Sequence, residues 1–336
     1  MRIGVIGYGS VGMAFHKLVM EKYWELKTRY GLVPQVVFIC DSSGCACREE
    51  GLDPSEAVKV KSSGQKLSSA YRVIDVYEAI RRCSIDVAVE CTPANFRDAE
   101  PAYSYIMEAL RNGSNVITTN KGPMALYMPA ILDEARSRGL VVLYSGTVGG
   151  GTPFISFVER ALRGNRITSF RGILNGTSNY VLTRIMKDGM SLEEAVAEAR
   201  RMGIAEADPS LDLNGTDSAA KLVILMNHIF ENRYTLRDVK ISGLDREIPE
   251  PERGHTVKLI ARSHPEPRVS LEQIPLGDPL NVEGTYNAVE FSVEELGKVY
   301  LIGRGAGGRE TAGAVIRDLV ELKSRLQIYH YRKELL

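Results

Sequence analysis

The residues best suited to chemistry lie in one acidic segment, from Gly203 to Lys221. Four carboxylates occur there within twelve residues, namely Glu206, Asp208, Asp212 and Asp217. Asp217 and Lys221 are four residues apart, so on a helix they share one face. Such a segment can bind a polar substrate, begin a helix with one salt bridge, or hold a divalent metal through oxygen ligands. The residue types alone leave these three interpretations open.

A glycine pattern near the N-terminus predicts a dinucleotide site. It follows an apolar run at 2–6 and opens a helical segment, and Asp41 ends the next apolar run. In this context the glycines allow a tight turn and let a pyrophosphate approach the N–H groups of the helix start. The residues expected to touch the cofactor are Gly7, Gly9, Ser10, Val11, Gly12 and Asp41. The cofactor is therefore NAD or NADP, with NAD preferred because a 2′-phosphate would meet the Asp41 carboxylate.

Two further polar groups follow predicted strands. Thr92 comes after the run 86–91, and Lys121 comes after the run 115–119. Because ligands collect at the carboxyl edge of a doubly wound sheet, both side chains are candidates for the cofactor site. A turn that caps the next helix explains Thr92 equally well, and a solvated surface charge explains Lys121 equally well.

The elements that must position these residues belong to an α/β class of fold. Through residue 145, β-branched runs alternate with helical periodicity, which predicts a doubly wound parallel sheet of the Rossmann type. The predicted strands are 2–6, 36–41, 86–91, 115–119 and 141–145, and the predicted helices are 11–28, 75–82, 97–111 and 123–138. Residues 42–72 are interpreted as a long excursion.

The pattern changes after residue 145. Strand candidates at 166–174, 285–293 and 298–303 are mixed with helix candidates at 178–188, 191–202 and 214–231, which indicates an α+β domain. We therefore expect a dinucleotide-binding domain over 1–145, completed by the C-terminal segment 304–336, and a substrate-binding and dimerisation domain over 146–303.

Composition narrows the function classes. The 336 residues include 42 basic and 42 acidic side chains, without the basic surface that nucleic-acid binding needs. No apolar run approaches the roughly 20 residues that span a bilayer, and the first strand begins at once, so a cytoplasmic protein is expected.

The five cysteines are odd in number and scattered, and are interpreted as free thiols. The five histidines show no ligand spacing and are assigned to packing or surface.

Several motifs together resemble homoserine dehydrogenase, in the same order and at similar spacing over nearly the whole chain. They include Gly7–Gly12, Thr119–Gly122, Gly146–Pro153, Gly172–Tyr180, 203–221 and Gly303–Thr311. The chain resembles the short form of the family, without a regulatory or kinase domain. The resemblance implies reversible NAD(P)-dependent hydride transfer between L-homoserine and L-aspartate 4-semialdehyde, in threonine and methionine biosynthesis. It also implies a homodimer formed through the sheet of the central domain.

The resemblance also implies roles for individual residues. Gly203, Glu206 and Asp217 would hold homoserine, and Asp212 belongs to the same predicted substrate site. Lys221 would be the acid/base residue, with Lys121 opposite it near the nicotinamide. Gly307 would lie in a loop that returns to the cofactor. These roles suit an amino-acid substrate, which brings an ammonium for carboxylates and a hydroxyl proton for a lysine.

A monovalent cation site of some family members does not carry over. The carbonyls of Val148, Gly150 and Thr152 could contribute to it, but Ser145 stands where the family has its glutamate ligand. No metal is therefore expected, and no activation by sodium or potassium.

Three other functions compete with this one. Another two-domain NAD(P) oxidoreductase would not explain the pair Asp217 and Lys221. An aspartate-semialdehyde dehydrogenase, which oxidises the same aldehyde, needs a thiolate near the substrate. Cys91 lies on the nucleotide side, and no cysteine follows it. A catalytically inactive nucleotide-sensing protein would have no reason to keep both Lys121 and Lys221.

Overall fold

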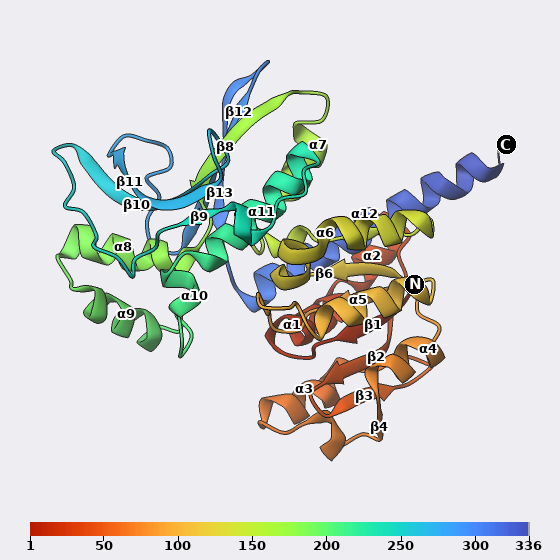
Figure 1. The fold of residues 1–336 in the computed structure, drawn as a ribbon. Coiled ribbons are helices and arrows are strands. Elements are labelled where there is room, and N and C mark those ends of the chain that lie inside the picture. The colour runs from red at the N-terminus through yellow and green to blue at the C-terminus, as the bar shows by residue number, and fades with distance from the viewer. Residues whose placement is uncertain (335–336) are drawn as a thin grey trace. The chain divides into compact units, whose positions relative to one another are not determined.

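A computed structural model describes residues 1–334, with the backbone alone over 328–334. The chain forms two compact units, each described here by itself (Figure 1). The first comprises Met1–Thr147 and the C-terminal segment from Gly307, and the second comprises Val148–Ala306. None of the helices within 1–334 is long and apolar enough to cross a membrane.

The first unit is built on a seven-stranded sheet in the order β4-β3-β2-β1-β5-β6-β7. Its strands are β1 (Arg2–Ile6), β2 (Gln35–Asp41), β3 (Gly44–Cys47), β4 (Val73–Ile74), β5 (Val87–Glu90), β6 (Asn115–Thr118) and β7 (Val142–Leu143). The five predicted strands pair in parallel, which confirms the doubly wound core. The excursion adds β3 and β4, which pair antiparallel and which its weak periodicity did not predict.

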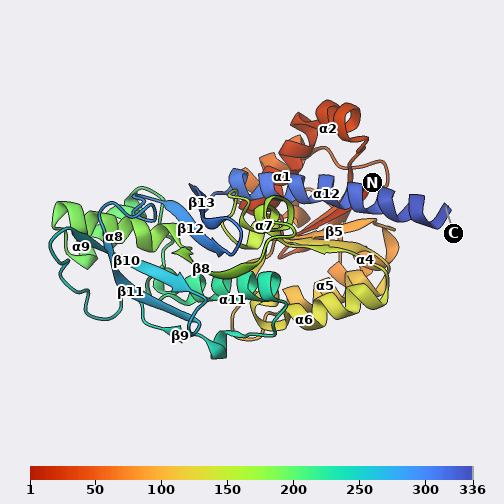
Figure 2. The same ribbon diagram turned by 90° about the horizontal axis from the view of Figure 1, so that it is seen from above.

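Helices cover both faces of this sheet. They are α1 (Ser10–Glu21), α2 (Tyr23–Tyr30), α3 (Pro54–Ser62), α4 (Val76–Arg82), α5 (Ala102–Arg111), α6 (Lys121–Ser137) and α12 (Gly308–Glu334), with short 3₁₀ turns at Leu67–Ser69 and Ser145–Thr147. Figure 2 shows α1 and α12 on one side of the strands and α5 and α6 on the other. The predicted helix 11–28 is two helices, because the chain leaves helical geometry at Lys22.

The C-terminal helix α12 contributes side chains to the hydrophobic core of the first unit. Its residues Ala312, Val315, Leu319 and Leu322 are fully buried in the same apolar cluster as the strands β1 and β5. His16 of α1 is also buried, between the hydroxyl of Tyr8 at 2.8 Å and the carbonyl oxygen of Leu52 at 2.9 Å. Burial lowers the pKa of His16 to about 4, so the ring is neutral and serves packing.

The prediction that all cysteines are free thiols is wrong for two of them. Cys40 and Cys45 form a disulfide, whereas Cys47, Cys83 and Cys91 are free. The reason is the unpredicted hairpin: β2 and β3 pair with Cys40 directly opposite Cys45, and their Cα atoms lie 4.0 Å apart. An odd number of scattered cysteines did not reveal this local pairing.

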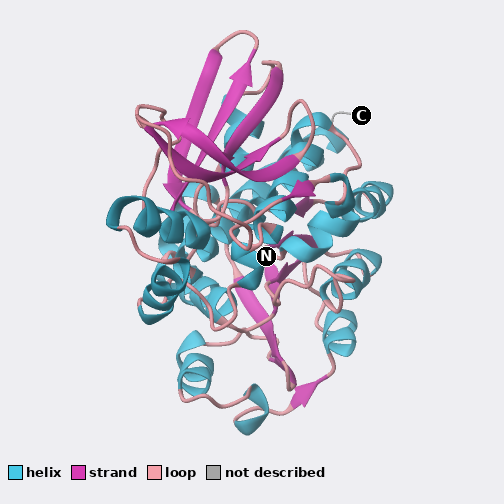
Figure 3. Cartoon of the chain, turned by 60° about the vertical axis from the view of Figure 1, so that its left-hand side comes forward, coloured by secondary structure: helices cyan, strands magenta, loops and turns pink. Residues whose placement is uncertain are grey.

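The second unit contains a six-stranded sheet in the order β13-β12-β8-β10-β11-β9 (Figure 3). Its strands are β8 (Ile167–Ile173), β9 (Lys240–Ile241), β10 (His255–Arg262), β11 (Arg268–Pro275), β12 (Tyr286–Val293) and β13 (Gly297–Arg304). The sequence predicted β8, β12 and β13 but missed the hairpin of β10 and β11, whose alternation is interrupted by charged residues. The α+β class of this unit is as predicted.

The helices of the second unit pack mainly against one face of its sheet. They are α7 (Phe154–Ala161), α8 (Gly176–Asp188), α9 (Leu192–Arg201), α10 (Ser210–Leu213) and α11 (Thr216–Phe230), with a 3₁₀ turn at Leu236–Asp238. Phe157 of α7 packs against Phe291, and Phe230 of α11 stacks on Phe170. This packing fixes α11, which carries Asp217 and Lys221, to the strand β8.

Candidate active site

The second unit contains a buried ion pair between two predicted site residues. Lys221 Nζ lies 2.7 Å from Asp217 Oδ2, one helical turn apart on α11, and their side chains are only 8% and 5% exposed. Lys221 also donates to the carbonyl oxygen of Leu174 at 2.7 Å, just beyond the end of β8. The helix and the strand end thus hold one ammonium in a fixed place with little water around it.

Asn175 joins this pair to a second carboxylate, and the sequence did not single it out. Its Nδ2 donates to Asp212 Oδ1 at 2.6 Å and to Asp217 Oδ2 at 2.8 Å. Its Oδ1 accepts from Ser178 N at 2.8 Å, which caps helix α8. The only available signal was its place at the carboxyl end of a strand inside the motif Gly172–Tyr180.

The remaining predicted substrate residues lie in the turn after α9. Gly203 adopts a left-handed conformation with φ 68°, and Glu206 is exposed. Asp208 accepts from Ser210 N at 3.0 Å and so serves the start of α10. The structure therefore joins Asp212, Asp217 and Lys221 through Asn175, while Glu206 is not part of this network.

In the first unit the glycine pattern has the geometry that a dinucleotide requires. Gly7 has φ +93°, and a Cβ there would lie 2.6 Å from the backbone of Cys91 and Thr92. A Cβ on Gly12 would lie 2.3 Å from the carbonyl oxygen of Gly7, whereas one on Gly9 would meet nothing within 4 Å. Gly7 and Gly12 are thus needed for close packing, whereas Gly9 leaves open space beside the start of α1. These residues, with Ser10 and Val11 in the first turn, fit a pyrophosphate.

The C-terminal segment returns to this loop. Gly307 has φ +135°, and a Cβ on Gly308 would lie 2.3 Å from Ser10 Oγ. The backbone at the start of α12 therefore runs directly beside the glycine pattern. This placement agrees with a loop that returns to the glycine pattern, and the cofactor contact of Gly307 stays a prediction.

Asp41 ends β2, but its carboxylate is held by its own chain. Lys61 Nζ lies 2.7 Å from Oδ2, which also accepts from Leu67 N at 3.0 Å. Ser43 donates to Oδ1 from its backbone N at 2.8 Å and from its hydroxyl at 2.6 Å. Burial opposes ionisation, yet Lys61 and Ser43 hold the pKa of Asp41 down at about 2. The group is an anion that already has a cation beside it.

The two strand-end candidates lie on neighbouring strands. Thr92 follows β5 and donates to Glu90, and Lys121 is the first residue of α6, after the N-cap Asn120. Asn120 Nδ2 donates to the carbonyl oxygen of Thr92 at 3.0 Å, so the two strand ends are tied together. Thr92 is thus part of a backbone-supporting network, and its predicted cofactor contact stays a prediction.

Ser145 has a cation beside it. Arg317 Nη2 donates to its hydroxyl at 3.2 Å, and its backbone N donates to Asp318 Oδ2 at 3.0 Å. In the second unit, Thr152 Oγ1 donates to the carbonyl oxygen of Arg304 at 2.9 Å. Over residues 1–334 no three His, Cys, Asp or Glu side chains group to hold a metal. Backbone carbonyl ligation by Val148, Gly150 and Thr152 stays a prediction.

A dinucleotide-type glycine loop on a parallel sheet, together with a second unit that holds a buried Asp–Lys pair, defines the class of NAD(P)-dependent oxidoreductases. Comparison with known proteins specifies the family. The family model "Homoserine dehydrogenase, NAD binding domain" matches residues 7–145, and the model "Homoserine dehydrogenase" matches residues 153–320.

Individual relatives agree with the family models. The chain is 39% identical over 335 residues to a homoserine dehydrogenase of Methanocaldococcus jannaschii, covering 96% of this chain and 98% of the relative. It is 35% identical to an NAD(+)-dependent homoserine dehydrogenase of Pseudomonas canavaninivorans, covering 96% of each. A solved mutant of a hyperthermophilic archaeal homoserine dehydrogenase, in complex with NADPH, is 30% identical with a TM-score of 0.85, covering 96% of this chain and 98% of that one.

The chain belongs to the homoserine dehydrogenase family. This confirms the resemblance carried by the sequence motifs, the oxidoreductase class, and NAD or NADP as the cofactor.

The buried ion pair of Lys221 and Asp217 leads to a prediction about the removal of Lys221. Lys221→Ala is expected to lower kcat by at least ~100-fold while cofactor affinity stays nearly unchanged, because Lys221 is the predicted acid/base residue and is not one of the predicted cofactor contacts. A matched control is Lys258→Met, which removes another buried lysine of the same unit, one that donates to Asn179 and Val282. Both variants should melt at lower temperature, but only Lys221→Ala should lose turnover. Equal kcat in Lys221→Ala and wild type would reduce Lys221 to a structural ion pair.

Proposed function

We propose that this chain interconverts L-homoserine and L-aspartate 4-semialdehyde by hydride transfer with NAD or NADP. The observation that carries the proposal is the buried group of Lys221, Asp217 and Asn175, in a chain of this family. We further propose that the first unit binds the dinucleotide and that the second unit binds the amino acid.

The proposed chemistry needs one proton donor on the protein. Nicotinamide cofactors give or accept a hydride at C4 of the ring. When a hydride reaches the aldehyde carbon of the semialdehyde, the C=O bond becomes an alkoxide. The Lys221 ammonium then donates its proton to that oxygen and regains one from water. In the other direction Lys221 first releases one proton to water, and the neutral amine then accepts the proton of the homoserine hydroxyl.

We assign Lys121 a second role at the same oxygen. Its position at the carboxyl edge of the sheet, at the first residue of α6, suits a cation that stabilises the forming alkoxide. We assign Asp212, Asp217, Glu206 and Gly203 to the ammonium end of the substrate. The hydrogen bonds from Asn175 to Asp212 and Asp217 support the first two assignments, because one amide then orients both carboxylates.

A nicotinamide absorbance assay tests the proposed reaction. The purified chain should reduce NAD or NADP with L-homoserine and should do so at least ~100-fold less efficiently with L-serine, L-threonine or myo-inositol, because the site must place the reacting carbon at a fixed distance from the ammonium group. Turnover of one of these alternatives without turnover of homoserine would contradict the proposal.

The cofactor preference depends on Asp41 and Lys61. A free carboxylate at this position favours the ribose hydroxyls of NAD and repels a 2′-phosphate. Lys61, 2.7 Å away, offsets part of that repulsion and can itself attract a phosphate. We therefore propose that both cofactors are used and that the preference for NAD is small.

Two substitutions test this balance in opposite directions. Lys61→Met should raise the ratio of kcat/KM for NAD over NADP by ~10-fold, since the 2′-phosphate then meets an uncompensated anion. Asp41→Ser should move the ratio toward NADP. Steady-state kinetics with both cofactors measure these ratios, and Lys59→Met is the matched control on the same helix. An unchanged ratio in both variants would show that the ribose binds elsewhere.

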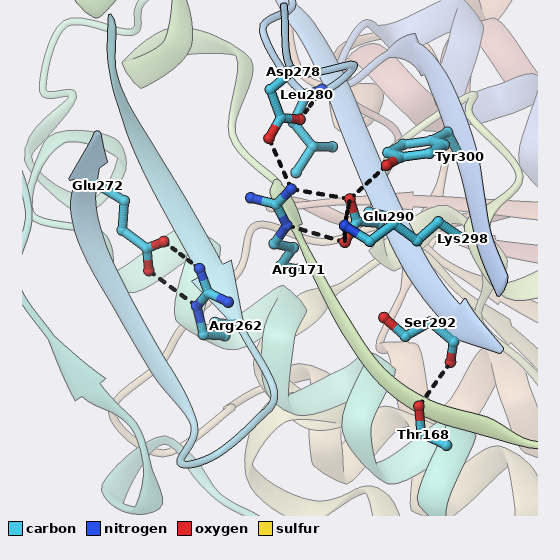
Figure 4. A network of polar contacts seen from close by, with 10 residues as sticks. All are labelled: Thr168, Arg171, Arg262, Glu272, Asp278, Leu280, Glu290, Ser292, Lys298 and Tyr300. Atoms are coloured by element: carbon cyan, nitrogen blue, oxygen red, sulfur yellow. Dashed lines mark hydrogen bonds and ion pairs between the residues drawn. The ribbon is translucent and has the colours of Figure 1, made fainter. Parts of the chain in front are cut away.

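We also propose that the chain forms a homodimer through the sheet of the second unit. On the face opposite α7 and α11, Arg171 lies between Glu290, at 3.0 Å, and Asp278, at 2.8 Å (Figure 4). Burial raises the pKa of Glu290, but Arg171 and Tyr300 hold it at about 2. Lys298 Nζ lies 3.3 Å from Glu290 Oε1 and adds a second cation. Two cations thus balance the two carboxylates of this face within one chain, which lets two copies of it meet without repulsion.

Sedimentation measures this assembly. We expect a particle of twice the chain mass of 37.1 kDa. Ser292→Arg adds a further cation directly opposite Lys298 of β13, which disturbs this charge balance, and should weaken the dimer by at least ~10-fold in dissociation constant. Ser63→Arg, on the exposed residue after α3, is the control that should leave it intact. A wild-type mass of one chain would contradict the proposal.

A further inference from the structure

Glu90 is a buried carboxylate that none of the assigned roles uses. It ends β5, which lies between β1 and β6 in the first sheet, and it is 1% exposed. A carboxylate in such a place is costly unless several donors satisfy it. Its position is the carboxyl edge of the sheet, where the cofactor is expected.

The donors come from both strand-end loops. Oε1 accepts from Thr92 N at 2.8 Å and from the Thr92 hydroxyl, and Asn120 Nδ2 lies 3.5 Å from it. Oε2 accepts from Thr118 Oγ1 at 2.8 Å. Burial raises the pKa of Glu90, and the hydrogen bonds from Thr92 and Thr118 oppose that rise. One oxygen thus serves mainly the loop after β5, and the other serves the end of β6.

The network continues from Glu90 to the start of α6. Thr118 Oγ1, which donates to Glu90, accepts from Asn120 N at 3.0 Å. Asn120 Oδ1 accepts from Gly122 N at 3.0 Å and caps the helix whose first residue is Lys121. The backbone of Lys121 is therefore held on both sides by groups that depend on Glu90.

The same carboxylate also supports the glycine loop. Glu90 accepts from the backbone N of Thr92. Gly7 packs against the peptide bond between Cys91 and Thr92, so closely that a Cβ on Gly7 would lie 2.6 Å from it. The network thus reaches the glycine loop, the loop after β5 and the start of α6. These three segments are the ones expected to surround the cofactor.

We propose that Glu90 is a positioning residue for hydride transfer: its two oxygens fix the loop after β5 relative to the start of α6, and so set the place of Lys121 beside the nicotinamide. The proposal rests on the proposed function of Lys121. It assigns Glu90 no contact with substrate and no proton transfer. Loss of the carboxylate should therefore act on turnover through Lys121.

The test uses Glu90→Gln in the full-length chain, in the wild-type and Lys121→Ala backgrounds. Glutamine keeps the size of the side chain but turns an NH₂ group toward donors, so one side of the network is lost. In the wild-type background kcat should fall at least ~10-fold while the KM for homoserine changes less than ~2-fold. In the Lys121→Ala background the same substitution should change kcat by less than ~2-fold, because the residue through which it acts is gone.

Two controls separate positioning from loss of stability. Glu108→Gln removes a partly buried glutamate that pairs with Arg81 near the end of α5 and should leave kcat unchanged. If Glu90→Gln does not fold, Thr118→Val keeps the shape of its residue, removes the donor to Oε2, and should lower kcat in the same Lys121-dependent way.

The outcomes distinguish the two proposals. Wild-type kcat in Glu90→Gln, or an equal fold-change in both backgrounds, would overturn the role of Glu90 while leaving the homoserine reaction intact. Failure of the wild-type chain to oxidise homoserine would instead overturn the proposed function.

Discussion

Lys221 and Asp217 must be buried as a pair, because either charge alone in that position would be strongly unfavourable. Removing one partner of a buried pair typically costs about 3–5 kcal/mol. The surrounding structure follows from this requirement. Helix α11 places the two side chains one turn apart, and the Leu174 carbonyl oxygen beyond β8 accepts a hydrogen bond from the ammonium group of Lys221. Asn175 Nδ2 donates to Asp217 Oδ2, the same oxygen that Lys221 contacts. The group is thereby ready to exchange a proton without first being organised by substrate.

Buried carboxylates in the first unit are also satisfied by nearby groups, but by different ones. The carboxylate of Glu90 accepts from the neutral donors of Thr92, Thr118 and Asn120. The carboxylate of Asp41 has the cation of Lys61 in addition to the neutral donors of Ser43 and Leu67. Neutral donors fix geometry in several directions, whereas a lysine mainly neutralises charge. The donors around Glu90 suit a residue that holds loops in position. The Asp41–Lys61 pair suits the proposed site for the adenosine ribose, where a 2′-phosphate is either attracted or repelled.

Local patterns in the sequence predicted the parts of the site that depend on local spacing. The Asp217–Lys221 pair follows from a four-residue interval on a helix, and the glycine loop follows from a strand, a turn and a helix in succession. The parallel core was equally predictable, because β-branched runs alternate with helical periodicity. The spacing of Asp217 and Lys221 alone did not distinguish a substrate site from a helix cap or a metal-binding loop. The resemblance to the family favoured the substrate site.

The missed features depend on contacts between residues distant in the chain or on strands without clear alternation. Asn175 meets Asp212 and Asp217 only after β8 and α11 pack together, and Asp41 meets Lys61 only after the excursion folds back. The hairpin of β2 and β3 is short, so the Cys40–Cys45 pairing was not visible in the cysteine count. Charged residues at buried positions, such as Lys258 in β10, hid the second hairpin.

A crystal structure with L-homoserine and the reduced cofactor, a combination that cannot react, tests most directly the claim that a preformed lysine group performs the proton transfer. The account predicts that the homoserine hydroxyl lies within hydrogen-bond distance, about 3 Å, of both Lys221 Nζ and Lys121 Nζ, with the substrate ammonium at Asp212 and Asp217. A complex in which homoserine is bound with its hydroxyl away from Lys221 would contradict it.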